Sequence, residues 1–125
     1  MALYSIDGRG RTRRVTYTPH EAEFNLWRSR LTAEKIDAIR SELRSLIDGD
    51  EVHTAGWMPG NDWTGTVWEP IYTDACQKNI ELSGYCFGLF VWEAIQEHPE
   101  AWSFGRYEKD GIEIRSLTYF RISHP

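Results

Sequence analysis

The run GYCFG at residues 84–88 has the G-x-nucleophile-x-G form of a nucleophile elbow, with Cys86 as the candidate nucleophile. An elbow places that residue on a tight turn between a buried strand and a helix, and it requires a histidine and an acid from later in the chain. The preceding residues, QKNIELS, favour a helix over a strand. We therefore expect Cys86 to be a small buried side chain, with Gly84 and Gly88 allowing another element to pack closely.

Two carboxylates could perform acid–base chemistry if the fold brought them together. Glu93 lies near the border of the apolar face of a predicted helix, and Asp62 belongs to a segment that could lie over that helix. In the alternative interpretation, Glu93 reaches solvent and Asp62 accepts hydrogen bonds from the backbone of its own turn. We favour the second interpretation, and Asp62, Glu93 and Cys86 remain the alternative catalytic set.

The sequence predicts neither a metal site nor a cofactor. The four histidines are far apart, and the spacings H-x-x-x-H, H-E-x-x-H and C-x-x-C do not occur. Cys76 and Cys86 are too few for a disulfide framework. If both lie on one helix, they are about 15 Å apart along its axis and cannot form a bond.

The segment GWMPGNDWTGTVWEP, residues 56–70, contains Trp57, Trp63 and Trp68 among glycines and prolines. This composition predicts an irregular but ordered segment. We expect it to cover a helix whose second face carries Tyr85 and Trp92, with at least one of its own tryptophans in the core and Asp62 holding its turn. The alternative is a pocket between residues 53–70 and the helix 74–97. Its lining would be Trp57, Trp63, Trp68, His53, Asp62 and Glu93.

The elements that must position these residues follow the order hairpin, helix, helix, irregular segment, helix, hairpin. Hydrophobic periodicity and capping residues predict strands near 3–6 and 15–17, helices near 19–31, 33–48 and 74–97, and strands near 102–106 and 112–122. We expect a single α+β domain spanning residues 1–125. In it, an antiparallel sheet made of the N- and C-terminal β-hairpins packs against three helices.

The charge is distributed unevenly along the chain, whose net charge is −5. Residues 31–100 carry thirteen acidic residues against four basic ones, whereas residues 1–30 carry six arginines against three acids. Direct nucleic-acid binding by the domain as a whole is disfavoured, because such binding depends on positive charge. The basic tip of the first hairpin, Arg9 to Arg14, is expected to be solvated, with contact to an anion or an acidic partner as the alternative.

The N-terminal residues and the length of the apolar runs indicate in which cellular compartment the protein is expected. The chain opens without a charged and then apolar leader pattern, and its longest nearly apolar run, residues 85–92, has eight residues against the roughly 20 of a bilayer span. With only two cysteines in addition, we expect a soluble cytoplasmic protein that does not contact membranes.

These observations favour an interaction protein without catalytic activity. We expect an acidic surface to dock on a protein partner with a basic surface, as small acidic inhibitors from phages and mobile elements do when they block nucleic-acid machinery. The candidate binding residues are Asp48, Asp50, Glu51, Trp57, Trp63 and Trp68. The alternatives are a small enzyme or ligand-binding domain with the tryptophan-lined pocket and, third, an aromatic platform for bases or sugars.

Overall fold

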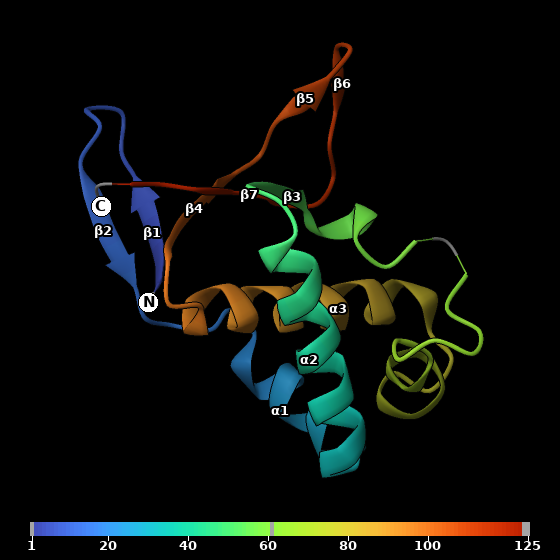
Figure 1. Ribbon diagram of the computed structural model, residues 1–125. Coiled ribbons are helices and arrows are strands. Elements are labelled where there is room, and N and C mark those ends of the chain that lie inside the picture. The colour runs from blue at the N-terminus through green and yellow to red at the C-terminus, as the bar shows by residue number, and fades with distance from the viewer. Residues whose placement is uncertain (1, 61, 124–125) are drawn as a thin grey trace.

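A computed structural model of the chain describes residues 2–60 and 62–123 (Figure 1). A five-stranded sheet lies on one side and three α-helices lie together on the other. The helices are α1 (Glu21–Ser29), α2 (Ala33–Asp48) and α3 (Ile80–Glu97). The strands are β1 (Ala2–Ile6), β2 (Thr12–Val15), β3 (Val52–Thr54), β4 (Ala101–Gly105), β5 (Glu108–Lys109), β6 (Ile112–Glu113) and β7 (Thr118–Arg121).

The strand order in the sheet is β2-β1-β4-β7-β3. The pairs β1–β2, β4–β7 and β3–β7 are antiparallel, but β1 and β4 are parallel, with Leu3 opposite Trp102. The mixed α+β class is confirmed, whereas the expectation of a purely antiparallel sheet is wrong. Both β1 and β4 begin at the same end of the sheet, where Ala2 lies opposite Ala101, so the strands run in the same direction.

The C-terminal strand is interrupted. The sequence predicted one strand over residues 112–122, but the structure divides it into β6 and β7. Strands β5 and β6 form a separate ribbon that projects from the body (Figure 1), and Ile112 on that ribbon is 73% exposed rather than packed on the sheet. The ribbon turns at Asp110 and Gly111, whose φ angles of 55° and 79° fit a two-residue type I′ turn.

Helix α1 begins later than residue 19, where the sequence predicted its start. It begins at Glu21, after His20 in the left-handed region with φ 49°. The carbonyl of Tyr17 accepts hydrogen bonds from Trp92 Nε1 (3.0 Å) and Gln96 Nε2 (2.8 Å) on α3. Because these bonds hold the backbone at Tyr17 against α3, α1 begins only after the chain has moved away from α3.

Both longer helices have a side-chain cap at the N-terminus. The Thr32 hydroxyl accepts from the Lys35 amide (3.2 Å), which confirms the predicted start of α2. Helix α3 begins at Ile80 rather than at residue 74, and the Asn79 side chain accepts from the Leu82 amide (3.0 Å). The predicted start of the third helix was therefore wrong by six residues.

The backbone before α3 explains that difference. A π-helical turn occupies Ile71–Ala75, and Gln77 and Lys78 then adopt φ angles of 51° and 66°. Two consecutive left-handed residues cannot continue a right-handed helix. The chain therefore turns before α3 begins, and Cys76 lies outside the helix.

The core is one cluster of buried hydrophobic residues centred on α3, which contributes Phe90, Val91 and Ile95 with no measurable exposure. Phe24 of α1 contacts Phe90 edge to face, with ring centroids 5.0 Å apart. Over residues 2–60 and 62–123, no helix has both the length and the apolar character that a transmembrane span requires.

The capping role of Asn79 predicts a measurable loss of stability. Asn79→Ala should lower the free energy of unfolding by about 1 kcal/mol, because the amide of Leu82 loses its acceptor. Asn79→Ser is the matched control, since a serine hydroxyl can cap the same amide and should retain most of the stability. Urea unfolding followed by circular dichroism measures both; equal losses in the two variants would contradict the cap.

Candidate functional site

A short turn after β3 presents the most exposed tryptophan of the segment. The 3₁₀ turn Ala55–Trp57 leaves the Trp57 side chain 58% exposed, and the Lys109 ammonium of the β5–β6 ribbon lies 5.3 Å from the centre of its ring. Beside Trp57 is a hollow of about 220 Å³. Its lining residues are Leu46, Val52, His53, Thr54, Trp57 and Met58.

Local contacts fix the backbone around this hollow. His53 Nε2 lies within hydrogen-bonding distance of the carbonyl oxygens of Ile47 (2.9 Å) and Asp50 (3.1 Å), which ties β3 to the end of α2. The Gly56 amide donates to Ser116 Oγ (2.9 Å), and a Cβ at Gly56 would come within 2.8 Å of that oxygen. A glycine is therefore needed for the close approach that holds the turn in place.

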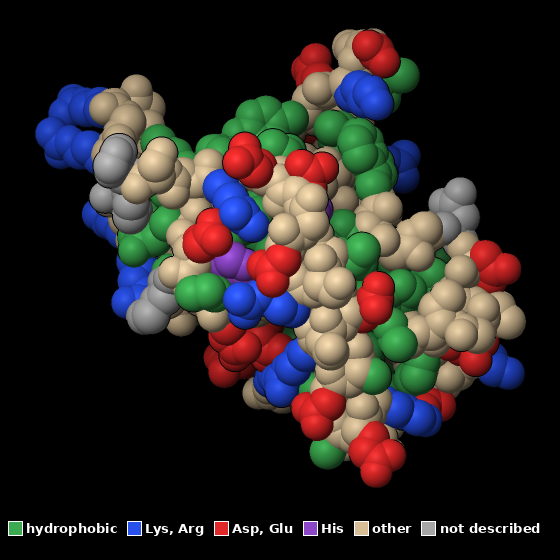
Figure 2. All heavy atoms as spheres, viewed as in Figure 1, with side chains coloured by type: hydrophobic (Ala, Val, Ile, Leu, Met, Phe, Trp, Pro, Cys, Tyr) green, Lys and Arg blue, Asp and Glu red, His purple; other side chains and the backbone are tan. Residues whose placement is uncertain are grey.

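Two of the three candidate acids, Asp50 and Glu51, have exposed side chains and directly precede Val52, which lines the hollow. Asp50 accepts from the Glu51 amide (2.8 Å), and the Glu51 carbonyl accepts from the Arg121 amide (3.0 Å), so the backbone there is held by β7. Acidic and hydrophobic side chains lie next to each other near the base of the β5–β6 ribbon (Figure 2). We call Asp50, Glu51, Val52, Trp57 and Met58 the β3 surface.

The third acid, Asp48, is occupied by contacts within the chain. Its carboxylate accepts from His98 Nε2 (2.7 Å) and from Arg44 Nε (2.9 Å), and these bonds, the one from His98 first, lower its pKa. His98 Nδ1 accepts from the Glu100 amide (3.0 Å), so the ring proton lies on Nε2 and is donated to Asp48. Asp48 thus connects the end of α2 to the α3–β4 turn.

Trp63 and Trp68 lie against α3. The Trp68 side chain is 5% exposed and contacts the Phe87 ring edge to face, with centroids 5.1 Å apart. Trp63 packs on the same ring at 5.9 Å and is partly buried. The expectation that at least one tryptophan of the segment belongs to the core is confirmed.

The segment does not cover the residues that it was expected to cover. Trp92 is buried against Tyr17 and Phe104, whose ring centroids lie 5.9 Å and 5.0 Å from its own. Tyr85 is exposed. The cover of α3 is therefore divided: the tryptophan segment packs on Phe87, and the chain before α1 together with β4 packs on Trp92.

The alternative catalytic carboxylates have separate partners. Asp62 accepts a hydrogen bond from the Thr64 amide (3.0 Å), and this bond lowers the pKa of the Asp62 carboxyl. The bond confirms the expected role of Asp62 in its own turn. Residue 61, directly before it, lies outside the described residues. The expectation that Glu93 reaches solvent is wrong, because its side chain is 14% exposed and is held between Arg28 (2.8 Å) and Arg40 (2.9 Å). The tryptophan segment contacts α3 at Phe87, about 9 Å from Glu93 along the helix axis.

Cys86 lies inside α3, so no strand-to-helix turn surrounds it. Burial raises the pKa of its thiol and of the Cys76 thiol, so both stay protonated and poorly nucleophilic. The expectation that the two cysteines are far apart on one helix is wrong, because Cys76 lies before α3 and the two thiols are near enough to influence each other's pKa. The expected close packing at Gly84 and Gly88 is also wrong, since a Cβ at either position would meet open space.

Within residues 2–60 and 62–123, no group of three or more potential ligand side chains is placed to hold a metal ion. The hollow beside Trp57 includes His53 but no residue of α3. The expected pocket between the tryptophan segment and that helix therefore does not coincide with it. The comparisons found no protein family, curated protein or solved structure that matches the chain.

Sequence reasoning did not find the strand that carries this site. In the run Val52-His53-Thr54, a β-branched residue stands on each side of a histidine, and this pattern is only a weak signal for a short strand. At three residues it is shorter than the runs that periodicity detects. Its position at the sheet edge depends on pairing with β7, about 65 residues later in the chain.

The two kinds of tryptophan predict different effects on stability. Trp68→Ala should lower the free energy of unfolding by about 3–5 kcal/mol, because it empties a buried site against Phe87. Trp57→Ala should cost less than about 1 kcal/mol, mainly through the lost contact with Lys109. Urea unfolding curves compare the variants; similar losses would mean that Trp57 is as much a core residue as Trp68.

The bonds of Asp48 predict a dependence of stability on acid pH. Since its folded-state pKa lies below the ordinary value of 3.8, ionised Asp48 stabilises the fold above that pH, and this contribution is lost as the pH falls through the lower, folded-state pKa. Asp48→Asn should remove this part of the acid destabilisation. Urea curves from about pH 6 to about pH 2.5 should therefore fall less steeply in the variant. Parallel pH profiles would contradict the assignment.

Proposed function

We propose that the protein is a small, cytoplasmic, non-catalytic interaction protein whose β3 surface docks on a basic protein partner. The proposed partner class is a nucleic-acid-handling protein that the chain inhibits by occupying its basic groove. The observation that carries the proposal is the combination at β3 of an exposed tryptophan, a neighbouring hollow of about 220 Å³ and two exposed carboxylates.

The apolar part of the β3 surface supports a protein partner. Val52 is 55% exposed and Trp57 is 58% exposed, and both line the hollow. Aromatic side chains that fill or border pockets commonly supply most of the energy of a protein interface. A partner side chain that enters the hollow would bury the ring of Trp57 and displace water from Val52.

The position of the site supports the same conclusion. Strand β3 is an edge strand, paired with β7 on one side only. A partner can therefore approach along the backbone as well as from above the side chains. Asp50 and Glu51 lead into β3, where a basic partner would meet both carboxylates as it docks.

The β3 surface is tested by capture and affinity measurement. Proteins retained from a cell lysate by the immobilised wild-type chain but not by Trp57→Ala are purified, and their affinity is measured from about 50 mM to about 500 mM salt. Trp57→Ala should weaken binding by about 2 kcal/mol or more, as for an interface hot spot. Asp50→Asn with Glu51→Gln should slow association and reduce its salt dependence.

A matched control separates the site from net charge. Glu34→Gln with Glu42→Gln removes the same charge from exposed positions on α2 and should leave affinity and salt dependence near those of the wild type. Partner binding that is indifferent to salt, or equal in the control and in the Asp50–Glu51 double variant, would contradict the acidic docking surface.

A further inference from the structure

The hairpin formed by β1 and β2 carries a second charged surface, of opposite sign. It projects from the sheet (Figure 1), and Figure 2 shows basic side chains gathered at its tip. Residues 8–14 read GRGRTRR, and the one acid at the tip, Asp7, accepts from the amides of Arg9 (2.8 Å) and Arg11 (3.0 Å). The carboxylate thus shapes the loop from which the arginines extend.

Among the described residues, most arginines of the body have partners for their guanidinium groups, whereas those of the hairpin do not; Arg115 of the body resembles the hairpin arginines in this respect. Over the described residues, Arg28, Arg40, Arg44 and Arg121 form ion pairs, and Arg30 and Arg106 donate to backbone carbonyls. By contrast, in the part of the chain that the structure describes, no ion pair or side-chain hydrogen bond engages a guanidinium group of the hairpin. These four guanidinium groups belong to Arg9, Arg11, Arg13 and Arg14.

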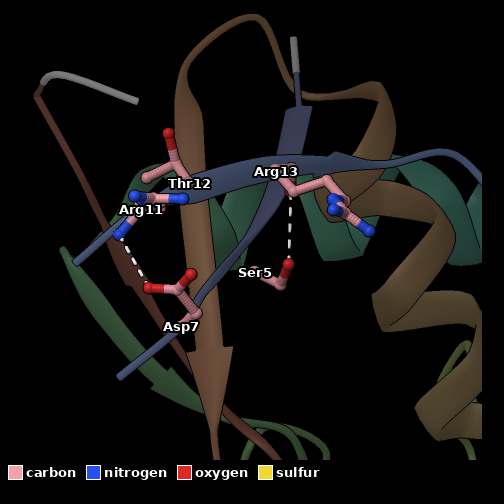
Figure 3. A pocket seen from close by; sticks show the side chains of 5 residues that line it. All are labelled: Ser5, Asp7, Arg11, Thr12 and Arg13. Carbon is pink, nitrogen blue, oxygen red and sulfur yellow. Dashed lines mark hydrogen bonds between the residues drawn. The ribbon is translucent and has the colours of Figure 1, made fainter. Parts of the chain in front are cut away.

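A hollow of about 410 Å³ lies on one face of this hairpin. Arg11 and Arg13 both line it; Arg13 lies on β2 and Arg11 directly precedes that strand, so in extended backbone their Cα atoms are about 7 Å apart. Ser5, directly across from Arg13 in the pairing register, contributes a hydroxyl that donates to the Arg13 carbonyl (3.4 Å). Figure 3 shows the lining residues Ser5, Asp7, Arg11, Thr12 and Arg13 around this space.

We propose that the β1–β2 hairpin is a phosphate-binding arm that contacts the sugar-phosphate backbone of a nucleic acid. A guanidinium group binds phosphate through two parallel N–H donors. The spacing of Arg11 and Arg13 allows each to contact a different phosphate of the backbone. Arg14 points to the opposite face of the ribbon and extends the contact to a second side.

The composition of the tip favours a nucleic acid over an acidic protein. Protein interfaces depend on buried aromatic or aliphatic anchors. Residues 7–14 contain none, and the nearest exposed apolar side chain is Ile6 at the end of β1. Binding to a nucleic-acid backbone requires no such anchor, because the release of counterions supplies most of its free energy. A two-stranded β-ribbon is also narrow enough to enter the major groove of a duplex.

The acidity of the whole chain does not prevent this local binding. Strand β2 forms one edge of the five-stranded sheet and β3 forms the other, so four strand spacings, about 19 Å, separate the two edges. That distance exceeds the screening length of about 8 Å at physiological salt. The hairpin therefore attracts phosphates largely independently of the acidic β3 surface, and the proposal does not depend on the function proposed for that surface.

Fluorescence anisotropy with labelled DNA of about 20 nucleotides, single-stranded and duplex, tests the proposal. At about 50 mM salt, Arg11→Gln with Arg13→Gln should weaken binding at least about tenfold and reduce the slope of log K against log salt by about 1 to 2. Arg115→Gln with Lys78→Gln is the matched control, since it removes the same charge elsewhere and should change the affinity less than about twofold. Circular dichroism verifies that each variant is folded.

The competing explanations predict other results. Failure of the wild-type chain to bind either DNA at low salt overturns the proposal, as does an equal loss in the control and hairpin variants. A labelled polyglutamate peptide that binds the hairpin more tightly than DNA also overturns it and assigns the arm to an acidic protein. Loss of DNA binding in the Arg11–Arg13 variant together with unchanged capture of a protein partner separates the hairpin from the β3 surface.

Discussion

The burial of α3 is the constraint on which the rest of the structure depends. The helix is apolar over most of its circumference, and every other layer of the protein covers part of it. Phe24 contacts Phe90 from α1, Trp68 contacts Phe87 from the irregular segment, and the backbone of the chain before α1 accepts a hydrogen bond from Trp92. Such a helix cannot be exposed to water without a large loss of hydrophobic stabilisation, so the chain folds around it.

Ion pairs determine how the three helices are aligned with one another. Glu93 of α3 accepts from both Arg28 of α1 and Arg40 of α2, so one partly buried carboxylate joins all three helices. Removing the Glu93 carboxylate would leave the two arginines facing each other without a negative charge between them. Apolar packing by itself would allow one helix to slide along another, and the ion pairs prevent this. The charges of Glu93, Arg28 and Arg40 therefore have a structural role.

The sequence predicts the class and the helices better than the sheet. Capping by Thr32 and the apolar stripe of α2 are local signals, and the predicted helix matches the observed one. The left-handed residues Gln77 and Lys78 have no such signal, because neither is a glycine, and the start of α3 was misplaced. The pairing of β1 with β4 and the edge position of β3 depend on contacts between distant residues. Hydrophobic periodicity carries no information about such contacts. The partial separation of tryptophans into core and surface was predictable, but which one is exposed was not.

The parallel pairing of β1 with β4 also governs when the fold can form. Leu3 lies opposite Trp102, so the second residue of the first strand pairs with a residue about 100 positions later in the chain. Helices α1 and α2 rely on local contacts and can form earlier, but the centre of the sheet can close only when strands about 100 residues apart come together. Such non-local topology slows folding and leaves the inner edge of the β1–β2 hairpin unpaired until β4 has been made.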